Sequence, residues 1–138
     1  LPPLFIAYRE DLGEGSEAIH QTVRERWIEG DPEIVAAMKD FASYAEEARA
    51  CIVSGKGADI GPLLDMNFNR RCSIFKVAAV NIEMVQRARA TGAHAKLAGS
   101  GGAIIGVYES ESMYEEIVAS MSAMDVKVFK PQIMPVTS

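Results

Sequence analysis

A glycine-rich stretch between two short apolar runs constrains the fold of this chain more than any other feature. Residues 95–108 read AKLAGSGGAIIGVY, and four small residues lie at the centre: Gly99, Ser100, Gly101 and Gly102. The flanking runs HAKL and AIIGVY are typical of paired strands, so the stretch predicts a β-hairpin. The loop is either a tight turn and nothing more, or a place where a ligand approaches the backbone closely, because glycine has no side chain to prevent that approach.

Helical periodicity dominates the region before the hairpin. The clearest helix begins at Asp31, has Pro32 in its first turn and ends at Gly55, and these residue types are favoured at those positions. Its apolar residues recur every three or four positions and form one stripe. The stripe consists of Ile34, Met38, Phe41, Ala45, Ala48 and Ile52.

Three shorter helices are expected around it. The first is capped by Ser16 and ends at Gly30, the second begins at Asp59, and the third is capped by Asn81 and ends at Gly92. These caps and stops are the residue types that helix termini favour. The third helix is expected to turn three apolar residues inward: Met84, Val85 and Ala88.

After the glycine loop the pattern predicts a helix and a final strand. Ser112 and Glu115 form a capping box, and the helix is expected to bury Met113, Ile117, Val118 and Met121. Alternation over residues 126–130 predicts the last strand, and LFIAY at residues 4–8 predicts the first. The order is strand, several helices, strand, strand, helix, strand. It predicts an α+β fold, a ferredoxin-like sandwich with extra helices inserted into the first crossover.

The composition is that of one soluble globular domain and excludes several classes of function. The 138 residues carry 14 Lys and Arg against 19 Asp and Glu, and this acidic balance argues against nucleic acid as a partner. The apolar runs are too short to cross a bilayer, so no membrane partner is expected. The two cysteines, Cys51 and Cys72, make neither a disulfide framework nor a metal site, which favours a reducing, cytoplasmic compartment.

The glycine loop is the first candidate site, because successive backbone N–H groups in a glycine turn form a concavity that binds anions. It is not a Walker-type phosphate loop, since GSGG is not followed by Lys-Ser or Lys-Thr. It is not a dinucleotide fingerprint either, because a strand and not a helix is expected to follow it. Lys96 lies nearby and is expected to face outward from its strand.

Two helical segments carry the other candidate groups. His20, Arg24 and Trp27 lie at helical spacing and suit an anionic or sugar-like ligand, with Arg24 on a carboxylate and Trp27 stacked on a ring. The alternative is that Trp27 belongs to the core and the arginines face solvent. The segment MNFNRR at residues 66–71 faces either a cleft or solvent. No catalytic triad or metal-ligand spacing can be assembled, so neither a catalytic residue nor a metal site is expected in this chain.

The stretch from Asn81 to Tyr108 resembles the third signature motif of the GHMP kinases, the family of galactokinase, homoserine kinase and mevalonate kinase. That motif runs roughly Ala-Lys-Leu-Thr-Gly-Ala-Gly-Gly-Gly-Gly and follows a helix that ends in Gly-Ala. Here Gly99, Gly101 and Gly102 match the family glycines, whereas Ala98 replaces the usual threonine. The upstream PLLDMNFNRR resembles the helix that precedes the motif. Within the family, GSGGA together with IHQTVRERWIEGD looks most like the glucuronokinases.

The resemblance implies that residues 1–138 are the C-terminal domain of a GHMP kinase, without the N-terminal domain that carries the nucleotide-phosphate loop. It implies ATP and magnesium as cofactors, bound mainly by that N-terminal domain, and a sugar or uronic acid that is phosphorylated at its 1-position. The substrate and phosphate site is expected at residues 99–102 with Arg24 and His20. The isolated chain is expected to be inactive.

Other interpretations stay open at this point. The protein could be another GHMP kinase, such as a galactokinase or a mevalonate kinase. It could be a non-catalytic ferredoxin-like module that binds a small molecule, or a structural or dimerisation domain in which the glycine loop is only a turn. Fold alone does not decide among these functions. A glycine- and serine-rich phosphate loop encoded before Leu1 would favour the enzyme.

Overall fold

The computed structural model describes residues 1–9, 17–99 and 101–134, with the side chains of residues 17–20 left out of the description. Five α-helices, one 3-10 turn and four strands are described. In chain order they are β1 (Leu4–Tyr8), α1 (Glu17–Ile28), α2 (Pro32–Val53), η2 (Gly57–Ile60), α3 (Gly61–Ile74), α4 (Ala79–Ala90), β2 (His94–Leu97), β3 (Ala103–Val107), α5 (Glu111–Ser122) and β4 (Lys127–Phe129).

The four strands form one antiparallel sheet in the order β2-β3-β1-β4. This is the strand order of a ferredoxin-like sandwich, in which α4 and α5 are the two helices of the basic motif. Helices α1, α2 and α3 are inserted between β1 and α4. The predicted α+β fold, with extra helices in the first crossover, is therefore confirmed.

The main core lies between one face of the sheet and helices α4 and α5. The strands contribute alternate residues to this core, because successive side chains of a strand point to opposite faces. The buried members from the strands are Phe5, Ala7, Ala95, Leu97 and Ile104, and those from the two helices are Met84, Val85, Ala88, Ile117 and Met121. The three residues predicted to face inward from α4 are all among them.

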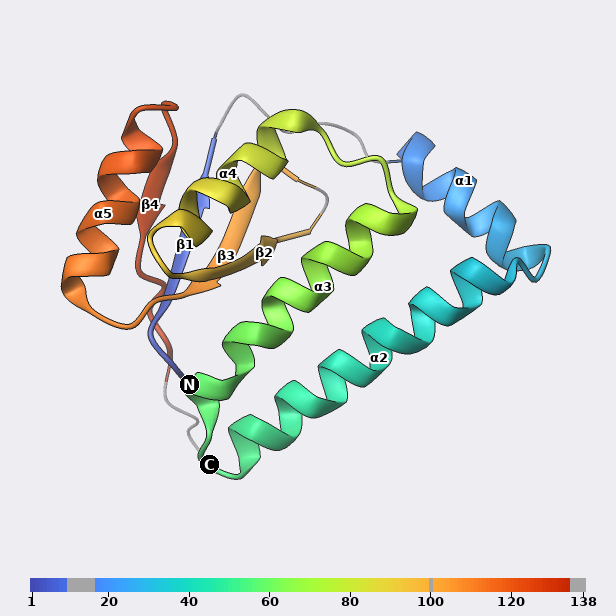
Figure 1. Cartoon of the computed structure of the whole chain (residues 1–138), viewed down its shortest axis with the longest axis horizontal. Helices are drawn as coiled ribbons and strands as arrows, with labels where there is room; N and C mark the ends of the chain where they lie inside the picture. The colour runs from blue at the N-terminus through green and yellow to red at the C-terminus, as the bar shows by residue number, and fades with distance from the viewer. Residues whose placement is uncertain (10–16, 100, 135–138) are drawn as a thin grey trace.

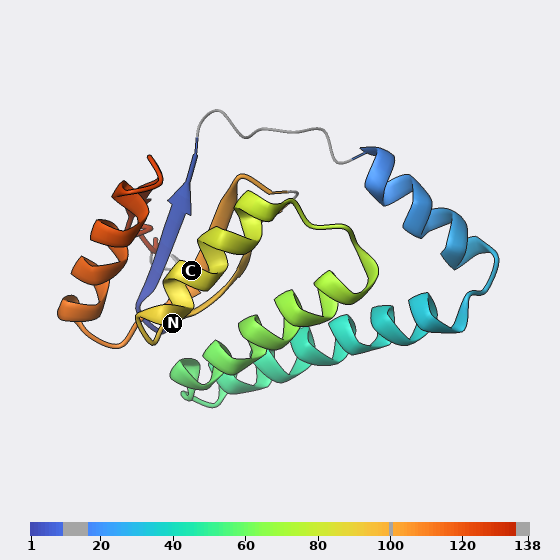
Figure 2. The same ribbon diagram turned by 45° about the horizontal axis from the view of Figure 1, so that its top comes forward.

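Helices α2 and α3 lie side by side as an antiparallel pair that extends away from the sheet (Figures 1 and 2). Helix α1 lies at the far end of α2, where a second small core joins these helices: Val23, Ile34, Ala37 and Ile74. The predicted stripe of α2 is buried only at Ile34, and Ile52 at its other end is 40% exposed.

Helix α3 runs along the outer edge of strand β2, and side chains there form hydrogen bonds with the backbone of that edge. The Ala95 N–H donates to Asp65 Oδ1 at 3.1 Å, and the Ala95 carbonyl accepts from Arg89 Nη2 at 3.4 Å. The Asp65 carboxylate also pairs with His94 Nδ1 at 2.6 Å and with Arg89 Nε at 3.0 Å. An exposed strand edge can pair with other chains, so this polar cluster protects the sheet. Nothing in the sequence singled out the cluster.

Several predicted helix ends are confirmed and others are wrong. Helix α2 has Asp31 as its cap and Pro32 in its first turn, as predicted. Helix α3 begins at Gly61 after the turn η2, not at Asp59. The predicted cap Ser16 lies outside the described residues. In the helix after β3, Val118 is 38% exposed, contrary to prediction.

Two caps were predicted two or three residues late. Helix α4 starts at Ala79 and has Ala78 at the cap position, so Asn81 lies inside the helix. Helix α5 starts at Glu111, and the Oγ of Ser110 accepts from the Met113 N–H at 3.1 Å. The predicted capping box at Ser112 is therefore wrong.

Candidate functional site

The glycine loop joins β2 to β3 in a conformation that three of its glycines make possible. The φ angles are +70° at Gly99, +130° at Gly101 and +78° at Gly102, a region that side-chain-bearing residues rarely adopt. The Ala98 N–H donates to the Ala103 carbonyl at 3.0 Å and closes the hairpin. The candidate residue Ser100 lies outside the described residues.

Asn81 shapes this loop from helix α4. Its side chain is 8% exposed, and its Oδ1 accepts from the Gly102 N–H at 3.0 Å. A Cβ atom on Gly101 would lie 2.6 Å from Asn81 Nδ2. The Gly102 N–H is therefore occupied, and Gly101 must lack a side chain because Asn81 fills the adjacent space. The first contact of a side chain at Gly101 would be with the protein itself.

The signal for Asn81 was present in the sequence and was misinterpreted. Asparagine is unfavourable inside a helix and common at a cap, so an Asn close to the start of a helical pattern predicts a cap. In the structure Asn81 is a buried residue of α4, and its partner lies 21 residues further along the chain.

Arg71 reaches the other side of the loop from helix α3. Its Nη1 donates to the Gly99 carbonyl at 3.0 Å, and its guanidinium carbon lies 5.4 Å from the centre of the Phe75 ring. The Arg9 N–H donates to the Gly102 carbonyl at 2.9 Å. Three separate elements thus hold the loop in place. Among the described residues, the N–H groups of Gly99 and Gly101 have no acceptor and remain available to a ligand.

The other polar residues of MNFNRR do not gather at the loop. Arg70 Nε donates to Asp40 Oδ2 on α2 at 2.8 Å, and Asn69 Oδ1 accepts from Arg89 Nη1 on α4 at 2.9 Å. These contacts tie helices together. Only Arg71 of this segment approaches the glycine loop.

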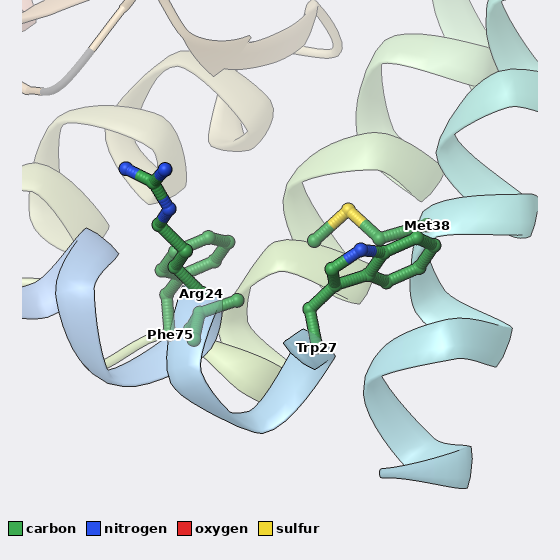
Figure 3. Close-up of a pocket in the computed structure, with 5 residues that line it drawn as sticks. Arg24, Trp27, Met38 and Phe75 are labelled. Atoms are coloured by element: carbon green, nitrogen blue, oxygen red, sulfur yellow. The ribbon is translucent and has the colours of Figure 1, made fainter. Parts of the chain in front are cut away.

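A pocket of about 510 Å³ lies between α1, α2 and the end of α3. Its lining is mainly apolar and consists of Val23, Arg24, Trp27, Met38 and Phe75. Trp27 is 49% exposed, so it is not a core residue. Figure 3 shows the guanidinium of Arg24 pointing away from Trp27 and Met38. The candidate residue His20 belongs to α1, and its side chain lies outside the described side chains.

The pocket and the glycine loop are linked through Phe75. This ring lines the pocket, and the guanidinium of Arg71, which bonds to Gly99, stacks on it. The predicted groups Arg24 and Trp27 therefore belong to the same region of the molecule as the loop, although none of the described contacts joins them to it directly.

Comparisons with known proteins place the chain in a family. It is 41% identical to a probable glucuronokinase 2 of Arabidopsis thaliana over 108 residues, which are 76% of this chain and 29% of that protein. It is 39% identical to glucuronokinase 1 of the same plant, again over 76% of this chain and 30% of the relative. This chain belongs to the GHMP kinases. It corresponds to their C-terminal part.

Solved structures show the same fold at low sequence identity. L. major mevalonate kinase in complex with R-mevalonate superposes with a TM-score of 0.78 at 18% identity, over 89% of this chain and 39% of that one. The Lin0012 protein from Listeria innocua superposes with a TM-score of 0.80 at 10% identity, over 94% of this chain and 38% of that one. No protein-family model matches the chain. The chain spans about 30% of the length of the curated relatives it matches.

The three glycines that carry the resemblance to the third GHMP motif are the three with positive φ in the loop. The glycines of the motif thus determine the backbone conformation of the loop, because each has a φ angle that residues with side chains rarely adopt. Within the described ranges, no three metal-ligating side chains come together, and no helix is long and apolar enough to cross a membrane.

Proposed function

We propose that this chain is the wall of the active site that carries the glycine loop in an ATP-dependent kinase of the glucuronokinase type, which phosphorylates a sugar or uronic acid at its 1-position. The observation that carries the proposal is the loop itself. Its path is held by Asn81, Arg71 and Arg9, and it leaves the N–H groups of Gly99 and Gly101 free among the described residues. The two curated relatives are glucuronokinases by name.

Phosphoryl transfer depends chiefly on positioning and on the stabilisation of negative charge spread over the phosphoryl oxygens. Backbone N–H groups that cost no reorganisation suit that role. We assign Gly99, Ser100 and Gly101 to the phosphate or acceptor side of the cleft. Gly102 positions the loop, because its N–H is bonded to Asn81.

Magnesium neutralises charge on the phosphates of ATP when it is bound. We propose that ATP and magnesium are held mainly by an N-terminal domain of the whole protein, as is typical of GHMP kinases. Residues 1–138 are then its C-terminal domain, and the catalytic base lies elsewhere.

Arg24, with His20 one turn earlier in α1, is the proposed contact for the carboxylate of a uronic acid. Arg24 is exposed at the edge of the pocket, and Trp27 offers an aromatic face to a sugar ring. The pocket is linked through Phe75 and Arg71 to the glycine loop, so a substrate that spans the two would place its carboxylate away from the reacting end.

The test is a kinase assay of the whole protein, including any segments that flank residues 1–138, with ATP and either glucuronate or a neutral sugar. Arg24→Ala should raise the KM for glucuronate by about ten- to a hundred-fold, the effect of losing a hydrogen bond to a charged group. The KM for ATP should hardly change, because only binding of the acceptor is weakened.

Arg49→Ala serves as the matched control, since Arg49 is an exposed arginine of α2 and should leave every constant unchanged. An equal loss with a neutral sugar would show that Arg24 supports the fold and does not bind a carboxylate. Absence of phosphorylation of any sugar by the wild-type protein would overturn the proposed function.

A further inference from the structure

Lys96 and Arg71 lie beside the glycine loop, and the function proposed so far gives their positive charges no role. Lys96 lies in strand β2, and its neighbours Ala95 and Leu97 are buried under the helices. Because side chains alternate along a strand, Lys96 is on the opposite face of the sheet, paired in register with Ile105 of β3. Arg71 extends from α3 to the Gly99 carbonyl.

Both cations are half-buried, and neither has a carboxylate partner among the residues that the structure describes. Four of the other half-buried arginines in the described part of the chain pair with an acid: Arg26 with Asp31, Arg70 with Asp40, Arg87 with Glu83, and Arg89 with Asp65. Among the described residues, Arg71 has the Gly99 carbonyl as its acceptor and its buried Nε has none. Lys96 has no described hydrogen-bond or ion-pair partner.

The electrostatics agree with this geometry. Burial lowers the pKa of the Arg71 guanidinium. Burial also lowers the pKa of the Lys96 ammonium, and the charge of Arg71 lowers it further. Two like charges that are partly removed from water and close to each other disfavour the folded state unless an anion neutralises them. In a chain of net charge −5, an unneutralised cationic pair is a feature that needs an explanation.

We propose that Lys96 and Arg71 form an oxyanion-binding site at the base of the glycine loop, and that it takes a carboxylate or phosphate group of a substrate. Arg71 offers planar N–H donors and Lys96 a compact charge, while the free N–H groups of Gly99 and Gly101 belong to the same loop. The identity of the ligand rests on the proposed function. The existence of the site rests on the two cations themselves, for which the described ranges 1–9, 17–99 and 101–134 supply no carboxylate partner.

The test measures binding directly and needs no turnover. Inorganic phosphate, ATP and glucuronate are titrated separately into the whole protein, with isothermal calorimetry and thermal stability as the two readouts. Lys96→Met should weaken binding of at least one of these anions by about tenfold or more, the effect of losing a charged hydrogen-bond donor. It should also remove the rise in Tm that the same anion gives the wild-type protein.

Two further variants make the result specific. Lys96→Arg keeps the charge and should retain most of the binding, whereas Lys39→Met removes an exposed lysine of α2 and should change nothing. Loss confined to ATP and phosphate identifies a phosphate site, and loss confined to glucuronate identifies a carboxylate site. Either result supports the proposal. Lys96→Met is preferred to a change of Arg71, because Arg71 also holds the loop at Gly99.

Wild-type affinity for all three anions in Lys96→Met, or no binding of any of them to the wild-type protein, would overturn the site. Its failure is distinguishable from failure of the proposed function. A protein that binds phosphate through Lys96 but phosphorylates no sugar keeps the site and loses the function. An active kinase whose anion binding is unchanged by Lys96→Met keeps the function and loses the site.

Discussion

At the scale of single residues, Asn81 couples helix α4 to the glycine loop. Its Oδ1 accepts from the Gly102 N–H, and its Nδ2 occupies the space beside Gly101. One amide side chain thus satisfies a buried backbone donor and also limits the loop to residues without a Cβ at Gly101. Removing one member of a buried hydrogen-bonded pair is costly, because the other member stays desolvated and has no partner.

Asn81→Leu should therefore destabilise the protein by about 1–3 kcal/mol, since it leaves the Gly102 N–H without an acceptor at similar side-chain volume. The measurement is the free energy of unfolding from denaturant titration. Asn67→Leu is the control: Asn67 is a half-buried asparagine of α3 with no described partner, and its change should stay within about 0.5 kcal/mol. Equal effects of the two substitutions would show that the loop does not depend on Asn81.

At the scale of elements, two helices begin at a residue whose side chain accepts a backbone hydrogen bond: α2 at Asp31 and α5 at Ser110. Helix α5 shows this, because two serines two residues apart compete for the same role and only Ser110 has its Oγ on the Met113 N–H. The capping-box pattern at Ser112 begins two residues after Ser110, the residue that caps the helix. The backbone at Ser110 is extended, with φ −147° and ψ 159°, which is the conformation that an N-cap residue adopts.

Ser110→Ala should cost about 1 kcal/mol of stability through loss of the cap. Ser112→Ala should cost much less, since Ser112 lies within the first turn of α5 and is exposed. Thermal unfolding of the two variants beside the wild type measures both effects. The reverse order of the two costs would restore the capping box that the sequence suggested.

At the scale of the whole molecule, the sandwich and the pair of helices α2 and α3 have separate cores and meet at the β2 edge of the sheet. Helices α4 and α5 complete the sandwich, whereas α2 and α3 form a pair that packs on β2 through α3 (Figure 1). The glycine loop lies where these parts meet, because Asn81 comes from α4 and Arg71 from α3. The loop is therefore sensitive to how the inserted helices sit on the sandwich.

The 138-residue chain by itself should unfold cooperatively on heating, because it contains the whole sandwich and its core. It should show no turnover of ATP with any sugar, since we place the nucleotide site and the catalytic base outside these residues. Circular dichroism during heating and a coupled kinase assay measure the two properties, with the whole protein as the positive control. Measurable phosphorylation of a sugar by the 138-residue chain would contradict this division of labour.

What the sequence determined by itself is the local structure. Alternation predicted the strands at residues 4–8 and around the glycine loop, and the cap at Asp31 with Pro32 predicted the start of α2; all of these are confirmed. The order of these elements was sufficient to predict the sandwich, because connection rules leave few ways to arrange them. The need for glycine in the loop is local too, since it arises from positive φ.

Only the tertiary structure decided which side chains serve the loop. Arg71 and Gly99 are 28 residues apart in the sequence, and Asn81 and Gly102 are 21 apart. Periodicity says which face of a helix is apolar, but not which polar residue at the edge of that face meets a loop from another element. The environment of Lys96 has the same origin, because its burial and the influence of the Arg71 charge depend on how α3 packs against β2.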